Sequence, residues 1–127
     1  MKIRIILLMS VLLATSQAFA ADISGFWKSV DAPGWIEIKL AQGKGFVVRN
    51  DKFPERVGRE ILKDLKADDS EQGLWTGQIY AERAGEYKDA ELTLAEADRM
   101  EIKVKVGFIS RTLEWQRVEE VPAMPAE

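Results

Sequence analysis

The 127-residue sequence predicts an all-β fold: a small eight-stranded antiparallel up-and-down barrel that follows a cleaved N-terminal signal peptide. Two observations carry this prediction: short segments in which apolar and polar residues alternate, and Gly, Asp, Asn and Pro residues between them. Alternation indicates strands, because successive side chains of a strand point to opposite faces. Eight segments spaced about 12 residues apart are typical of a β-sandwich or barrel. Closure into a barrel removes exposed sheet edges and leaves room inside for side chains or one small ligand.

The first 20 residues have the three parts of a secretory signal peptide. Lys2 and Arg4 form a basic start, residues 5–13 are mainly apolar, and Ala18-Phe19-Ala20 matches the small-x-small cleavage pattern. The apolar run of about 9 residues is much shorter than the roughly 20 that a membrane-spanning helix needs. We therefore expect cleavage after Ala20 and export to a Gram-negative periplasm.

Without residues 1–20 the chain has 107 residues and a formal charge of −5, because two cations and no acids are removed. Phosphate contacts need clustered Lys and Arg, so an acidic domain without a basic run predicts no nucleic-acid partner. No later segment approaches membrane-spanning length, and we expect no membrane span in the mature chain. We expect residues 21–120 to form the barrel and residues 121–127, which contain two prolines, to form a flexible C-terminal tail.

Alternation is clearest in residues 100–106, 36–40 and 90–94. Four further strands follow from enrichment in aromatic and β-branched residues, at 24–30, 45–50, 74–81 and 109–118.

The segment 57–67 is ambiguous. Val57, Ile61 and Leu65 are spaced as on one face of a helix, and the composition of the segment also favours a helix. Its position among short strands favours an eighth strand instead, so both assignments remain open at this point.

The chain contains neither cysteine nor histidine. This composition excludes disulfides, thiolate zinc sites, Fe–S clusters and cysteine nucleophiles, and it removes the most common base at neutral pH. The serines have no recognisable nucleophile motif, and we expect no enzyme, although a carboxylate pair or a Ser–Lys arrangement stays open. The acidic turn 68–71 does not have the spacing of an EF-hand loop, so we expect no metal and no cofactor.

Residues near the two ends of the mature chain form a recognisable combination. Gly25-Phe26-Trp27 opens the first strand, and Arg117 lies in the last strand, two residues after Trp115. This resembles the lipocalin-type signature, in which a Gly-x-Trp on the first strand packs against an Arg from the last. A guanidinium over an indole ring closes one end of the barrel through a cation–π contact. Gly25, Trp27 and Arg117 are therefore the expected closing residues.

Four motifs extend the resemblance along almost the whole mature chain. They are Gly25-x-Trp27, Leu74-Trp75-x-Gly77-x-Ile79-Tyr80, Gly85-x-Tyr87 and Arg111-Thr112-x-x-Trp115-x-Arg117. In these motifs the chain is similar to a family of small exported bacterial proteins, domain of unknown function 2147, whose members resemble lipocalins in fold. The chain departs from the family pattern at Ala81-Glu82, where members usually have Asp-Pro, and in its short middle segment, residues 50–59. These departures place any shared site in the loops in doubt and leave the barrel prediction intact.

Aromatic side chains are the candidate lining of a binding site inside the barrel, where they could stack on a partly apolar ligand. The competing interpretation is that they fill an ordinary core. Arg111 shares a strand face with Leu113 and Trp115, so it either anchors a ligand carboxylate or lies at the rim. The candidate lining residues are Trp35, Trp75, Tyr80, Tyr87, Arg111 and Trp115.

The function that we expect is binding of a small apolar or amphipathic molecule by an exported, disulfide-free, lipocalin-like protein. The alternative is a protein–protein interaction module whose barrel is filled. A mainly apolar pocket of a few hundred Å³ favours the first function, and a solid core favours the second.

Overall fold

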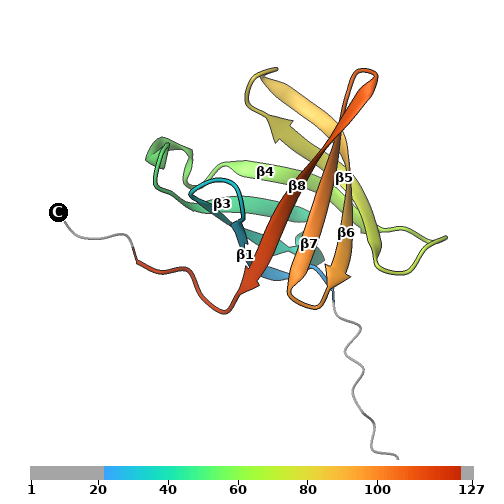
Figure 1. The fold of residues 1–127 in the computed structure, drawn as a ribbon, viewed down its shortest axis with the longest axis horizontal. Helices are drawn as coiled ribbons and strands as arrows, with labels where there is room; N and C mark the ends of the chain where they lie inside the picture. The colour runs from blue at the N-terminus through green and yellow to red at the C-terminus, as the bar shows by residue number, and fades with distance from the viewer. Residues whose placement is uncertain (1–21, 124–127) are drawn as a thin grey trace, which may run out of the picture.

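Eight strands follow one another in chain order around a closed antiparallel barrel in the computed structural model, which describes residues 22–123 (Figure 1). The all-β, eight-stranded up-and-down prediction is confirmed. The predicted signal peptide, residues 1–20, and the last four residues of the predicted tail lie outside the described residues. The strands are β1 Gly25–Ser29, β2 Gly34–Lys39, β3 Lys44–Asn50, β4 Glu60–Ala67, β5 Leu74–Ala81, β6 Glu86–Glu96, β7 Arg99–Val106 and β8 Ile109–Val118.

Two short 3₁₀ helices complete the secondary structure of residues 22–123: η1, Leu40–Gln42, and η2, Pro54–Arg56. No helix in this part of the chain is long and apolar enough to cross a membrane.

Residues 60–67 of the ambiguous segment form strand β4 and not a helix, and Val57 lies in the connection before the strand. The register between β4 and β5 shifts between Lys63 and Lys66, and Asp64 there has a φ of 55°. Asp is among the residues that tolerate this left-handed conformation. Because the irregularity interrupts the alternation, Leu62 and Leu65 both enter the core although they are three residues apart. An irregular strand therefore carries apolar residues at a spacing that is also typical of a helix.

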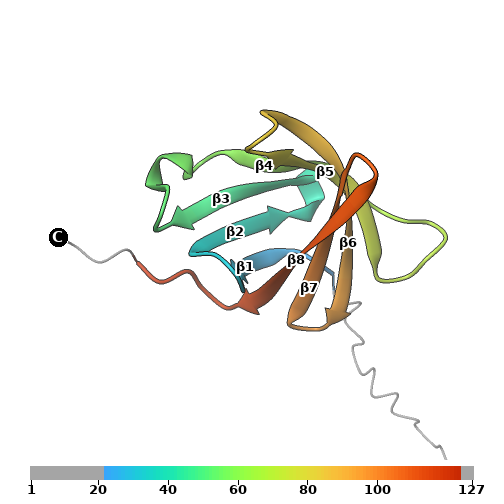
Figure 2. The ribbon, with the colours of Figure 1, turned by 45° about the horizontal axis from the view of Figure 1, so that its top comes forward.

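The barrel closes where β1 pairs with β8, which can be followed in Figure 2. Trp27 of β1 lies opposite Arg117 of β8, and Ser29 lies opposite Trp115. This pairing gives both terminal strands two neighbours, so the sheet has no free edge.

Every second side chain of a strand points into the barrel, and these inward side chains form the core. Trp27, Trp75 and Trp115 belong to one cluster of buried apolar side chains that fills the middle of the barrel. Successive turns of an up-and-down barrel lie at alternate ends, so the β5–β6 turn and the β7–β8 turn lie at the same end (Figure 1). The β6–β7 turn and the start of β1 lie at the opposite end.

Candidate functional site

Two of the predicted lining residues, Trp75 and Trp115, point into the barrel but belong to its packed core. Trp75 lies opposite Leu92 and Trp115 lies opposite Met100, and both partners are fully buried. For these two tryptophans the structure therefore shows the core arrangement that was the competing interpretation. The indole nitrogen of Trp115 is buried and has no hydrogen-bond partner among residues 22–123.

Trp35 does not line the barrel, and its predicted position there is corrected. Trp27 lies opposite Ile36 in the core, so the neighbouring pair Lys28 and Trp35 lies on the other face of the sheet. On that outer face the Trp35 ring has the Lys28 ammonium 5.0 Å and the Arg49 guanidinium carbon 4.5 Å from its centroid. Trp35 is buried by these cationic side chains outside the barrel.

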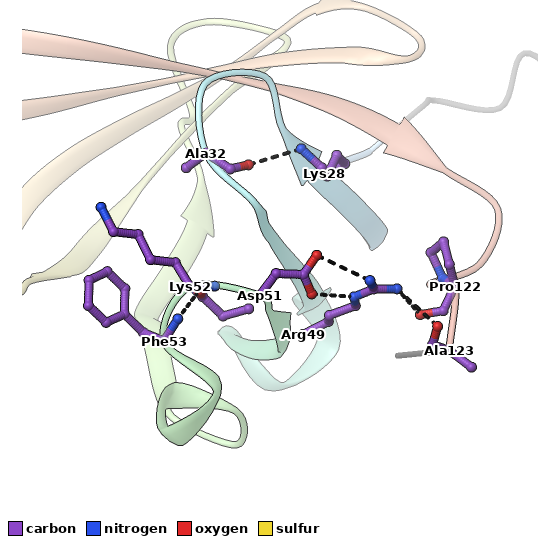
Figure 3. A network of polar contacts seen from close by, with 9 residues as sticks. Lys28, Ala32, Arg49, Asp51, Lys52, Phe53, Pro122 and Ala123 are labelled. Atoms are coloured by element: carbon purple, nitrogen blue, oxygen red, sulfur yellow. Dashed lines mark hydrogen bonds and ion pairs between the residues drawn. The ribbon is translucent and has the colours of Figure 1, made fainter. Parts of the chain in front are cut away.

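Arg49 also holds the beginning of the C-terminal tail (Figure 3). Its guanidinium donates to both carboxylate oxygens of Asp51, at 2.7 and 3.1 Å. The same group donates to the carbonyl oxygens of Pro122 and Ala123, at 2.7 and 3.2 Å. The hydrogen bond from Arg49, aided by its positive charge, lowers the pKa of Asp51.

The rings of Tyr80 and Tyr87 do not point into the barrel as predicted, although Tyr80 borders the cavity described below. They lie opposite each other on neighbouring strands, while the adjacent residue Ile79 belongs to the core, so both rings lie on the outer face. Their ring centroids are 5.3 Å apart in an edge-to-face arrangement. The Tyr87 hydroxyl donates to the carbonyl oxygen of Glu60 at 2.7 Å. Burial, and next the charge of Glu60, raise the pKa of Tyr87.

A cavity of about 400 Å³ lies at the end of the barrel that carries the β5–β6 and β7–β8 turns. This volume is within the range of small-molecule sites, roughly 300–1,000 Å³. Its wall is mainly aliphatic, and it opens to solvent on one side. The apolar side chains that line it are Ile79, Ala81, Ala84, Val104, Val106, Ile109 and Leu113. Tyr80 borders it as well.

The charged groups that line the cavity differ in whether they already have an ion-pair partner. The acid in its lining, Glu82, is already engaged by Arg59 and by Arg56, whose Nε is 3.5 Å from the carboxylate. Of the three lining cations, Lys88 is paired with Glu86 at 2.6 Å, and this hydrogen bond and charge lower the pKa of Glu86. Arg83, in the β5–β6 turn, is exposed and has no ion pair among residues 22–123.

Arg111 is the predicted site residue that the structure places at this cavity with its charge available. It is exposed, it lines the opening, and its guanidinium has no ion pair or hydrogen bond among residues 22–123. A free guanidinium beside an aliphatic wall can bind a carboxylate or phosphate through two parallel hydrogen bonds.

Gly25, Trp27 and Arg117 meet at the opposite end of the barrel. The Arg117 guanidinium carbon is 4.4 Å from the Trp27 ring centroid. Gly25 has a φ of 118°, and a Cβ added there would be 3.3 Å from an Arg117 nitrogen. A side chain at position 25 would thus disturb both the backbone and the position of the guanidinium.

A second hollow, of about 380 Å³, lies against strands β4 to β7 and is lined mostly by polar side chains, including Lys66, Gln78, Asp89, Glu91 and Lys105. Charged side chains of both signs line this hollow, and it lacks the mainly aliphatic wall of the first cavity. Among the described residues, no three His, Cys, Asp or Glu side chains are grouped so that they could hold a metal ion.

Of the residues that line the aliphatic cavity, sequence reasoning named only Tyr80 and Arg111 and missed the others, among them Lys88, Val106 and Ile109. The signal that could have found them is strand parity. Ala90 and Leu92 are the buried positions of β6, so Lys88 has the same parity and lies opposite Ile79. Val106 and Ile109 extend in the same way the inward-facing positions of β7 and β8.

The fold and the cavity together define a small up-and-down β-barrel protein with one open, mainly aliphatic pocket. The chain belongs to the family described as "Uncharacterized protein conserved in bacteria (DUF2147)", whose profile matches residues 25–117. Neither a curated protein nor a solved structure shows significant similarity to the chain.

Proposed function

We propose that the protein is an exported, periplasmic binding protein that takes a small amphipathic anion into the cavity between the β5–β6 and β7–β8 turns. The observation that carries this proposal is the combination of an aliphatic wall with the unpaired Arg111 at the opening. The apolar part of the ligand lies against the wall, and its carboxylate or phosphate meets the guanidinium. Aromatic stacking has no place in this proposal, because the rings of all five predicted aromatic lining residues lie on the outer face of the barrel or in its packed core.

The expected binding free energies favour an amphipathic ligand over a purely apolar one. Burial of eight methylene groups contributes roughly 6 kcal/mol before the cost of association, whereas a micromolar Kd corresponds to about 8 kcal/mol. A charge-assisted hydrogen bond contributes about 1.5–3 kcal/mol. A short acyl chain therefore needs the contact with Arg111 to reach micromolar affinity.

Isothermal titration calorimetry with decanoate and with decanol tests the proposal, because the two probes differ in charge. We expect decanoate to bind with a Kd on the order of micromolar and decanol to bind more weakly. Arg111→Gln should weaken decanoate binding by about tenfold and leave decanol binding unchanged. Arg99→Gln is the matched control, because Arg99 is exposed on β7 and does not line the cavity. Absence of decanoate binding, or equal affinity in the Arg111 variant, would contradict the proposal.

The alternative function, a protein–protein interaction module with a filled barrel, is favoured by the tryptophan core beneath the cavity. Such a module should bind neither probe. Export is tested separately: mass spectrometry of the protein from the periplasmic fraction should find a chain that starts at Ala21.

A further inference from the structure

We propose that the tip of the β7–β8 hairpin docks on an anionic lipid surface. The tip consists of residues 106–109 and joins β7 to β8 at the cavity end of the barrel (Figure 1). This proposal goes beyond ligand binding and does not depend on it.

The tip exposes three apolar side chains in a row of four residues. The Phe108 side chain is fully exposed, Ile109 is 70% exposed and Val106 is 43% exposed. Val106 lies opposite Ile109, so Gly107 and Phe108 form a two-residue turn, and Gly107 supplies its positive φ of 64°. Scattered single apolar residues are ordinary on a protein surface, but a fully exposed Phe at the apex of a projecting apolar turn marks a contact site.

The charges around the tip indicate which kind of surface it docks on. Between Ile102 and Leu113 the hairpin carries three cations, Lys103, Lys105 and Arg111, and no acid, although the whole chain has a net charge of −3. Lys103 and Arg111 have no ion-pair partner among residues 22–123, and Lys105 has only a long contact of 3.9 Å with Glu91. Cations set behind an apolar apex are complementary to anionic lipid headgroups above an acyl region.

A folded protein partner fits this surface less well. A stable protein–protein interface buries about 800 Å² on each side, which a four-residue turn does not provide. A bilayer requires no matching shape, and a single aromatic ring can enter the region between headgroups and acyl chains. The tip also shares Val106 and Ile109 with the cavity, and Arg111 lines the cavity two residues further along β8, so docking would turn the cavity opening toward the lipid.

Flotation with lipid vesicles tests the proposal. We expect the protein to float with vesicles of phosphatidylglycerol and phosphatidylcholine, to float less at high salt, and to float little with phosphatidylcholine alone. Phe108→Ser should reduce binding to the anionic vesicles at least tenfold. Phe108→Trp should retain binding, and its added fluorescence should be quenched by lipids with brominated acyl chains.

Val57→Ser is the matched control, because Val57 is an exposed apolar residue, 46% accessible, in the β3–β4 connection beside Arg56. It should bind vesicles as the wild type does. The proposal is overturned by equal binding to both kinds of vesicle, by a Phe108→Ser variant that binds normally, or by an equal loss in Val57→Ser. Phe108 does not line the cavity, so Phe108→Ser should keep its affinity for decanoate, which separates this proposal from the proposed function.

Discussion

Arg117 binds three separate carbonyl oxygens while its guanidinium carbon lies 4.4 Å from the ring centroid of Trp27. The acceptors are the carbonyls of Ala97 at 2.9 Å, Ser24 at 2.7 Å and Asp22 at 2.7 Å. One side chain of the last strand thus joins the β6–β7 turn to the segment that enters the first strand. The chain has no cysteine, so no disulfide closes this end of the barrel. The contacts of Arg117 with Trp27 and with the three carbonyls hold it together instead.

Removing the guanidinium should destabilise the barrel. We expect Arg117→Ala to lower the free energy of unfolding by roughly 2–4 kcal/mol, because three charge-assisted hydrogen bonds and the ring contact are lost. Arg117→Lys should recover only part of this stability, since an ammonium cannot reproduce the planar fork of donors. Urea unfolding measures both, with the exposed Arg99→Ala as a control expected within about 0.5 kcal/mol of wild type. A loss in Arg117→Ala no larger than in that control would show that closure does not depend on this contact.

Two tryptophans of the core should respond differently to the same substitution. Trp27 donates from its indole nitrogen to the carbonyl of Ile23 at 3.0 Å, whereas the indole nitrogen of Trp115 has no partner among the described residues. Tryptophan-to-phenylalanine removes similar volume at both sites, but only at Trp27 does it leave a buried carbonyl unpaired. We expect Trp27→Phe to cost about 1–3 kcal/mol more than Trp115→Phe in thermal or urea unfolding. The reverse order would contradict this account.

The number and order of strands could be predicted because a strand with one buried face shows a two-residue period, which is clear at 36–40, 90–94 and 100–106, and because aromatic and β-branched residues mark four of the others. Strand β4 was the exception for a physical reason. The residues with helical spacing do not share a face: Val57 lies before β4 and is 46% exposed, whereas Leu65 is in the core. The irregularity around Asp64 brings Leu62 and Leu65 into the core together and breaks the two-residue period there. Periodicity alone cannot separate such a strand from a helix, whereas the requirement for a closed sheet can.

The site was predicted less well, because aromatic residues were selected by type and not by parity. Trp35, Tyr80 and Tyr87 have the wrong parity for the interior and are covered on the outer face by cationic side chains. Nothing in composition distinguishes an aromatic ring buried by a neighbouring Arg or Lys from one buried in a core. Arg111 was placed correctly on the face of Leu113, because a single regular strand carries both.

Tyr87 should make stability depend on pH above 10. Burial raises the pKa of its phenol in the folded protein, so the unfolded chain ionises first. Its contribution to stability is complete below the ordinary tyrosine pKa of about 10 and is lost as pH rises through the higher folded value. Tyr87→Phe should remove this part of the pH dependence and, at pH 7, cost about 1 kcal/mol through loss of the bond to Glu60.

The matched control for Tyr87 is Tyr80→Phe, because the Tyr80 hydroxyl has no hydrogen bond among residues 22–123. It should change stability at pH 7 by less than about 0.5 kcal/mol. Urea unfolding at pH 7 and at pH 11 measures both variants. If Tyr87→Phe kept the full alkaline loss of the wild type, the buried phenol would not be its source.

Loss of Arg49 should uncover Trp35. Arg49 covers the ring at 4.5 Å, and Trp35 is only 9% exposed. Arg49 also holds the tail through Pro122 and Ala123 (Figure 3). We expect Arg49→Ala to increase acrylamide quenching of tryptophan fluorescence, and the increase should disappear in a Trp35→Phe background. Asp51→Asn should have a smaller effect, because the bonds from Arg49 to the tail carbonyls do not need the carboxylate. An increase that persisted without Trp35 would place the newly exposed indole elsewhere and contradict the arrangement.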